Sequence, residues 1–148
     1  MKKITIINKH LGIGGTEKYI SDLTRMLSND YDINLVVSYK IKELPTFPIS
    51  SKVNVSYLVK GFPTYEKINK YIKRKQYISA LNEYFNNINL RFLRLIRTIK
   101  ILRKIDSDYL IMTRFFDSLL ASLFLKNKGT KTLFLVKENY SKLKLLIF

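Results

Sequence analysis

The sequence begins with an apolar run, a glycine-rich loop and a helical pattern, and this order constrains the fold more than any other feature. The apolar run covers residues 3–8 and is nearly continuous. Such a run is typical of a strand buried on both faces of a parallel sheet. The loop that follows contains Gly12, Gly14 and Gly15. This order predicts an α/β domain that handles a nucleotide or a phosphate, because the glycines admit a ligand close to the backbone and a helix start attracts anions.

A helix is predicted over residues 16–28. Thr16 is a suitable N-cap, and Glu17 falls in the first turn, where the helix dipole favours a negative charge. Apolar residues recur at the spacing of one helical face, at Tyr19, Ile20, Leu23, Met26 and Leu27. This helix is therefore expected to pack that face on the sheet, with its first turn beside the glycine loop.

Further strands and helices alternate along the rest of the chain. Strands are predicted over residues 33–39, 53–59, 109–113 and 131–136. The third of the five strands, at 53–59, alternates apolar and polar residues and is expected nearer a sheet edge. Residues 65–104 are helical and basic, and a helix over residues 117–126 has Asp117 as its expected N-cap. This alternation predicts an α/β fold with a Rossmann-like, mostly parallel sheet and helices on both faces.

Composition limits the chemistry. The chain has 148 residues, no cysteine and one histidine, His10, so a thiolate or multi-histidine metal site is excluded and no metal or cofactor is expected. The opening residues do not form a signal peptide, and no apolar stretch is long enough to span a membrane. A cytoplasmic location is therefore predicted. The net charge of +16 favours anionic partners, although a lysine-rich genome would also produce it.

The glycine loop departs from the dinucleotide-binding fingerprint G-x-G-x-x-G. Glu17 stands where the third glycine belongs, and no clear acidic residue ends the second strand to hold a ribose. An enzyme that uses a nicotinamide or a flavin is therefore disfavoured. Two interpretations of the loop remain, namely contact with a phosphate or acceptor, and a tight turn that serves only the packing of the helix on the strand.

Several segments together resemble the opening domain of family 4 glycosyltransferases. The likeness lies in the apolar residues 2–7, the sequence Gly-Gly-Thr-Glu at 14–17, the strand at 33–37, and the segments 106–114 and 131–139. These enzymes have the GT-B fold, in which two Rossmann-like domains face a cleft. The resemblance implies that residues 1–148 form the N-terminal, acceptor-side domain, with a basic helical insertion at about 65–104. The C-terminal donor domain of the family is absent from this sequence.

The resemblance also implies site residues at the cleft. The loop near the donor phosphate or the acceptor would comprise Gly12, Gly14, Gly15, Thr16 and Glu17. His10 and Arg114 follow the first and fourth strands and would lie on the acceptor side. Glu138 and Asn139 follow the fifth strand and are the catalytic candidates. The family often has a histidine where this chain has Asn139, and an asparagine cannot act as an acid or base near neutral pH.

The implied reaction moves a sugar from a nucleotide-sugar donor to a hydroxyl of an acceptor glycan or a lipid-linked sugar, in the synthesis of surface polysaccharide or glycolipid. Because a GT-B site lies between two domains, the isolated 148-residue chain is predicted to be inactive. The alternative is a non-catalytic remnant or subunit that binds an anionic membrane or a partner carrying the donor domain.

The basic middle of the chain contains an amphipathic helical pattern. Between residues 67 and 104, Glu83 is the only acid among many lysines and arginines. Five basic side chains lie mainly away from the apolar face and form the predicted membrane-facing set: Arg91, Arg94, Arg97, Lys100 and Lys104. This pattern suits the headgroup layer of an anionic membrane at the inner face of the cell. It equally suits an ordinary surface helix with solvated charges. Nucleic acid is an unlikely partner, since no matching module signature accompanies the charge.

The pair Asp106 and Asp108 imitates the D-x-D metal motif of another glycosyltransferase fold. The pair directly precedes the fourth strand, at the end of a parallel sheet that lies away from the ligand crevice. Turn formation is therefore the favoured role for these carboxylates, and metal binding is the alternative.

Overall fold

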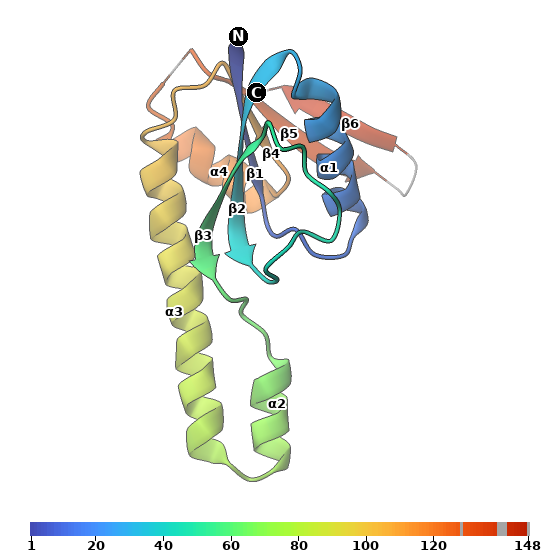
Figure 1. The fold of residues 1–148 in the computed structure, drawn as a ribbon. Helices are drawn as coiled ribbons and strands as arrows, with labels where there is room; N and C mark the ends of the chain where they lie inside the picture. The colour runs from blue at the N-terminus through green and yellow to red at the C-terminus, as the bar shows by residue number, and fades with distance from the viewer. Residues whose placement is uncertain (128, 139–141, 148) are drawn as a thin grey trace.

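The protein has a Rossmann-like α/β fold, seen in a computed structural model that describes residues 1–127, 129–138 and 142–147, with side chains up to residue 135 (Figure 1). The elements in chain order are β1 (Lys2–Asn8), α1 (Gly15–Leu27), β2 (Tyr31–Lys40), β3 (Asn54–Lys60), α2 (Glu66–Lys73), α3 (Tyr77–Leu102), β4 (Tyr109–Met112), α4 (Phe115–Phe124), β5 (Lys131–Glu138) and β6 (Lys142–Ile147). The strands form one sheet in the order β3-β2-β1-β4-β5-β6, which is parallel from β3 to β5. The predicted fold class is confirmed.

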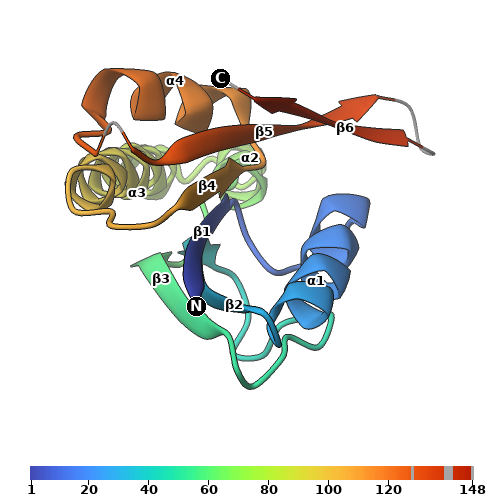
Figure 2. The same ribbon diagram turned by 90° about the horizontal axis from the view of Figure 1, so that it is seen from above.

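Helices cover both faces of this sheet (Figure 2). On one face, α1 packs Ile20 against strand residues such as Ile6 and Leu35. On the other face, Leu102 of α3 and Leu120 of α4 pack with residues such as Ile7 and Val36. Neighbouring residues of β1 thus point into opposite cores, which explains why this strand is continuously apolar.

The strand β3 lies at an edge, as the sequence predicts, and β1, predicted to be buried on both faces, lies between β2 and β4. Ile4 of β1 is in register with Ile33 of β2 on one side and Tyr109 of β4 on the other. The chain therefore continues to opposite sides of β1, since β2 and β3 lie on one side and β4 and β5 on the other. The strand order thus reverses its direction at β1. Such a reversal places a crevice at the carboxyl ends of β1 and β4, where open α/β sheets bind their ligands.

Helices α2 and α3 form a hairpin that projects beyond the carboxyl edge of the sheet (Figure 1). The hairpin occupies residues 66–102, within the segment 65–104 that the sequence predicts to be helical and basic. Arg74 and Gln76 separate the two helices, and Lys75 between them has a positive φ of 58°. Only the second half of α3 packs on the sheet, through residues such as Leu102.

Two helix starts differ from their predictions. Thr16 is not the N-cap of α1, because Gly14 occupies that position and no side chain caps the helix. Asp117 is not the N-cap of α4 either. Arg114 takes that position, and Asp117 lies in the first turn with its side chain fully buried. The Asp117 carboxylate pairs with Arg94 of α3 and does not cap its own helix, so local capping propensity does not decide this boundary.

The last strand was not predicted. β6 pairs antiparallel with β5, with Leu135 opposite Leu145. No described helix is both long and apolar enough to cross a membrane.

Candidate functional site

A cavity of about 630 Å³ lies at the carboxyl edge of the sheet. Loops after β1, β3 and β4 contribute Lys9, Phe62 and Arg114, and the middle of α3 forms another wall. The complete lining comprises Lys9, Tyr39, Phe62, Pro63, Ile88, Arg91, Phe92, Arg94, Leu95, Arg114 and Phe116. Four lining residues are cationic, and no described lining residue carries a carboxylate. The cavity therefore combines positive charge with an aromatic and aliphatic wall.

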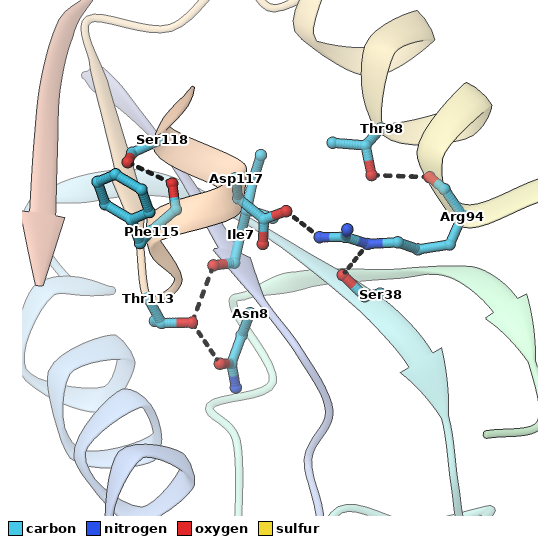
Figure 3. Close-up of polar contacts among 9 residues, drawn as sticks. All are labelled: Ile7, Asn8, Ser38, Arg94, Thr98, Thr113, Phe115, Asp117 and Ser118. Carbon is cyan, nitrogen blue, oxygen red and sulfur yellow. Dashed lines mark hydrogen bonds and ion pairs between the residues drawn. The ribbon is translucent and has the colours of Figure 1, made fainter. Parts of the chain in front are cut away.

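Arg94 is the most deeply placed of these cations. Its side chain is about as buried as the core, with 5% of the residue exposed, and its guanidinium is paired with the carboxylate of Asp117 (Figure 3). The Arg94 Nε also donates to the Ser38 Oγ of β2 at 3.4 Å. Burial, and to a smaller extent the positive charge of Arg114, together lower the pKa of Arg94 to about 10. The guanidinium is still charged at neutral pH, so Asp117 and Arg94 form a true ion pair.

The other three cations of the cavity have no ion-pair partner among the described side chains. Arg91 donates to the Tyr65 hydroxyl at 3.1 Å and stacks over that ring. Lys9 lies over the ring of Phe62, with its Nζ 5.0 Å from the ring centroid. Arg114 is partly buried at the N-cap of α4. Uncompensated cations beside a helix start produce a positive potential that favours an anionic ligand.

Phe62 joins the cavity to the glycine loop. The Tyr39 ring meets Phe62 edge to face with centroids 5.4 Å apart, and the His10 ring does so at 5.7 Å. Because Lys9 covers the same ring, residues from the ends of β1, β2 and β3 converge on this one side chain. His10 thus lies between the cavity wall and the glycine loop.

His10 contacts Glu17 of α1 on its other side. The His10 Nδ1 lies 3.2 Å from the Glu17 Oε1 and 3.3 Å from the backbone N of Gly12. Nδ1 can donate its own proton to Glu17 or accept the Gly12 N–H, but one nitrogen cannot do both. Burial lowers the pKa of His10 below its usual value, while Glu17 acts in the opposite direction. The imidazole is therefore neutral near pH 7 and carries its one proton in either of two arrangements.

The carboxylate of Glu17 fills the space beside Gly14. A Cβ added to Gly14 would overlap the Glu17 Oε2, so the residue at 14 must be glycine while Glu17 keeps this position. Glu17 is itself buried. The start of α1 thus already has an acidic side chain next to it. The cations without an ion-pair partner lie on the other side of Phe62, in the cavity.

The loops after β1 and β4 are held together by a polar contact. The Thr113 hydroxyl donates to the Asn8 Oδ1 at 2.8 Å (Figure 3). The Asn8 Nδ2 in turn donates to the His10 carbonyl at 2.8 Å. Asn8 is buried, so both halves of its amide are used where solvent cannot replace these bonds. This contact fixes the origin of the loops that supply His10 and Arg114.

The structure separates the predicted site residues into groups. His10, Gly12, Gly14, Gly15, Thr16 and Glu17 form one group at the start of α1. Arg91, Arg94 and Arg114 line the cavity. Glu138 ends β5 at the same carboxyl edge of the sheet, but its side chain lies outside the described part. Asn139 lies outside the described residues.

The predicted membrane-facing set does not form one surface. Arg94 is buried, and the expectation that it faces a membrane is wrong because Asp117 and Ser38 hold it against the sheet. Arg97 donates to the Leu58 carbonyl of the edge strand. Lys100 and Lys104 are exposed near the end of α3, close to the start of β4 and thus toward the opposite edge of the sheet.

Asp106 and Asp108 lie at that opposite edge and have structural partners. The Lys3 backbone N donates to the Asp108 Oδ2 at 2.7 Å, and the Lys3 Nζ lies 3.8 Å from the Asp106 Oδ2. These contacts fit the turn role. Among the described residues, no group of three or more potential ligands is placed to hold a metal ion.

The lining residues that were not predicted from the sequence include Lys9, Tyr39 and Phe62. Each follows or ends a predicted parallel strand, and that position was the available signal, because such ends converge on one edge. A scan against protein-family models finds no matching family, and a search of curated proteins finds no significantly similar one. The resemblance to family 4 glycosyltransferases therefore stays a prediction.

Proposed function

We propose that this chain is the acceptor-side domain of a glycosyltransferase whose acceptor carries a phosphate or diphosphate group. The observation that carries the proposal is the cavity at the carboxyl edge, where Lys9, Arg91 and Arg114 lie beside the rings of Tyr39 and Phe62. Cations hold phosphate oxygens, and aromatic faces suit the apolar side of a sugar ring or a lipid stem. The sugar nucleotide would bind mainly to a second domain, as the resemblance implies.

His10 and Glu17 are the proposed proton-handling pair at this site. In the transfer, the acceptor oxygen bonds to the anomeric carbon of the donor, and the bond from that carbon to the diphosphate oxygen breaks. The proton of the acceptor hydroxyl must then go to a base. A neutral His10 that donates Nδ1–H to Glu17 presents Nε2 as that base, and Glu17 stabilises the imidazolium that forms. Glu138 stays an alternative base, and Asn139 a proposed acceptor contact.

A non-catalytic subunit is the second candidate. It is favoured by the Glu17 carboxylate, which occupies the space beside Gly14 where the resemblance expects a donor phosphate. Such a subunit would hold the anionic ligand in the cavity for a partner. Both candidates are consistent with a cytoplasmic location, and both require an anionic ligand in the cavity. A binding experiment therefore tests the ligand site that they have in common. A sugar-transfer experiment distinguishes the enzyme domain from the non-catalytic subunit.

The binding experiment compares three probes by calorimetry on the full chain. These are geranyl diphosphate, the same lipid carrying a monosaccharide, and a uridine diphosphate sugar. We expect the sugar-bearing lipid to bind at least several-fold more tightly than the other two, and Arg114→Ala to weaken the binding of both lipids by roughly tenfold through the loss of one phosphate contact. Arg25→Ala on the exposed face of α1 is the matched control. Equal affinity for geranyl diphosphate with and without the sugar, or preferential binding of the sugar nucleotide, would contradict the acceptor role.

The transfer experiment adds a separately produced donor domain from a family 4 enzyme to the same mixtures. Sugar transfer that depends on His10 would support the catalytic candidate. Tight binding of the sugar-bearing lipid with no transfer in any combination would support the binding subunit instead.

A further inference from the structure

The α2–α3 hairpin is a projecting element with its own internal contacts. Ile68 of α2 and Ala80 of α3 are buried between the two helices. The Asn87 Nδ2 donates to the Thr64 carbonyl at 2.7 Å, and the Lys67 Nζ lies 3.9 Å from the Glu83 carboxylate. These contacts fix the hairpin as a unit, and its tip at residues 72–78 lies far from the sheet (Figure 1).

The tip carries a concentration of positive charge. No acidic residue occurs between Glu66 and Glu83, and the Glu83 carboxylate already lies near Lys67. The exposed basic side chains near the turn are Lys70, Lys73, Arg74 and Lys75. A cluster of this kind on a projecting element is attracted to an anionic surface and repels a second copy of itself.

Large apolar side chains are exposed at the same tip. Ile78 is 79% exposed and Tyr77 66%, and Leu81 and Phe85 on the following turns are 55% and 59% exposed. Ile72 of α2 is also about half exposed. Exposing several large apolar side chains on one projecting element costs free energy in water, unless another apolar phase covers them.

These apolar residues belong to one stripe along α3. Ile78, Leu81, Phe85, Ile88 and Phe92 follow the i, i+3, i+7 spacing of a single helical face, and all are exposed. The buried residues of the helix lie on another face, at Ala80, Asn87, Arg94, Thr98 and Leu102. Ile88 and Phe92 also line the cavity, so the stripe leads from the tip to the cavity over about 20 Å.

We propose that the tip of the α2–α3 hairpin inserts into the headgroup layer of an anionic lipid bilayer. Ile72, Tyr77, Ile78 and Leu81 enter the acyl boundary, while the four basic side chains near the turn contact lipid phosphates. The bilayer is favoured over a second copy of the chain because the tip combines its apolar residues with charges of one sign. The proposal rests on the hairpin alone. It therefore holds whether or not the protein transfers sugar.

The apolar stripe on α3 indicates how the cavity would lie relative to the membrane. With the tip in the bilayer, the cavity lies about 20 Å from it along α3, and the apolar face between them is continuous. A lipid whose phosphate occupies the cavity would therefore lay its tail along Ile88 and Phe85 toward the membrane.

The chain allows a direct test because it contains no tryptophan. Tyr77→Trp places a single indole at the tip, and Met26→Trp places one at an equally exposed position on α1, on the other face of the sheet. The probes are vesicles of phosphatidylglycerol and phosphatidylcholine, and vesicles of phosphatidylcholine alone. We expect a blue shift of the indole emission at position 77 with the anionic vesicles, and none at position 26. No shift at 77, or equal shifts at both positions, would overturn the proposal.

Variants of exposed tip residues distinguish the contributions of apolar and charged side chains to membrane binding, which a vesicle flotation assay measures. Ile78→Asp with Leu81→Asp should lower partition to anionic vesicles by more than about tenfold, and Lys73→Ala with Arg74→Ala by several-fold. Both pairs are exposed, and circular dichroism checks that each variant is folded. Unchanged partition in the aspartate variant would contradict the insertion of the tip.

Two further measurements distinguish other outcomes. Arg114→Ala should leave vesicle partition unchanged while it weakens ligand binding in the cavity by roughly tenfold, so this proposal and the proposed function fail separately. If the aspartate variant instead converts a dimer to a monomer in sedimentation, the stripe is an interface between copies and the proposal is overturned. Equal partition to neutral and anionic vesicles would also count against it.

Discussion

Arg94 of α3 and Asp117 of α4 form an ion pair in the interior, and this pair links the hairpin to the wall of the cavity (Figure 3). The two residues are 5% and 0% exposed. Ser38 of β2 accepts a further hydrogen bond from Arg94, so three elements meet at one guanidinium. The second carboxylate oxygen of Asp117, Oδ2, has no hydrogen-bond partner among the described residues. The buried carboxylate of Asp117 is therefore stabilised mainly by its contact with the Arg94 guanidinium.

Asp117→Ala should lower the free energy of unfolding by about 3–5 kcal/mol, because it leaves the buried Arg94 without a counter-charge. The double variant Arg94→Met with Asp117→Leu should recover most of this loss, since an apolar pair of similar volume has no desolvation cost. Urea unfolding followed by circular dichroism measures both.

The exposed pair Asp22 and Arg25, 3.4 Å apart on α1, provides the control. Asp22→Ala should cost no more than about 1 kcal/mol, as is usual for surface ion pairs. A similar small loss for Asp117→Ala would show that the buried pair does not contribute in the way that its geometry indicates.

His10 is the only histidine, so its titration can be followed by NMR without assignment ambiguity. We expect a pKa below the ordinary value of about 6.5, because burial disfavours the charged ring. Glu17→Gln should lower the pKa of His10 further, since the Glu17 charge raises it. Arg114→Ala should raise the pKa, since that positive charge lowers it.

The same shift sets a pH dependence of folding. The unfolded chain protonates His10 at a higher pH than the folded chain does, so the His10 contribution to stability is complete above about pH 6.5. It declines as the pH falls through the lowered pKa of the folded state. A pKa of His10 at or above that of a model peptide would contradict both expectations.

Gly14→Ala should act through Glu17 and not through backbone strain, because Gly14 has an extended backbone with φ of 165°. The added Cβ meets the far end of the Glu17 side chain, which can rotate away. The change in stability should therefore be small, about 1 kcal/mol or less. The pKa of His10 should fall, as it loses the carboxylate that raises it.

The double variant Gly14→Ala with Glu17→Gln tests this route. In the absence of the Glu17 charge, Gly14→Ala should leave the pKa of His10 almost unchanged. An equal effect of Gly14→Ala in both backgrounds would mean that the alanine acts on the loop in some other way.

The sequence predicts the sheet well because burial in a parallel sheet leaves a local pattern. The continuous apolar run in β1 indicates burial on both faces and the alternating run in β3 indicates an edge position, and both are confirmed. β6 was not predicted, because an antiparallel strand that follows a parallel one depends on its partner strand. The start of α4 was misplaced because Asp117 satisfies a distant arginine and not the helix end.

The α3 helix shows why the site was only partly predictable. Several of its large apolar residues lie on the exposed stripe, whereas its buried residues include Asn87, Arg94 and Thr98 beside Leu102. Hydrophobic periodicity assigns the apolar face to the core and the arginines to the surface, which is wrong for Arg94. The true orientation is set by tertiary partners, namely Asp117, Ser38 and the Thr64 carbonyl, none of which is near in sequence.

The cavity should bind inorganic pyrophosphate with a strong dependence on salt. Its uncompensated cations Lys9, Arg91 and Arg114 release counterions when they bind an anion, so affinity should fall steadily as ionic strength rises. Arg91→Ala and Arg114→Ala should each weaken binding by roughly tenfold, which corresponds to the loss of one charge-assisted contact. Arg25→Ala on α1 should have no such effect.

Calorimetry at two salt concentrations measures these affinities. NMR of His10 adds an independent readout, because a bound anion offsets the nearby positive charges and should raise the pKa of His10. Binding that is insensitive to Arg114→Ala, or a pKa of His10 that does not move on saturation, would place the anion at another site on this basic protein.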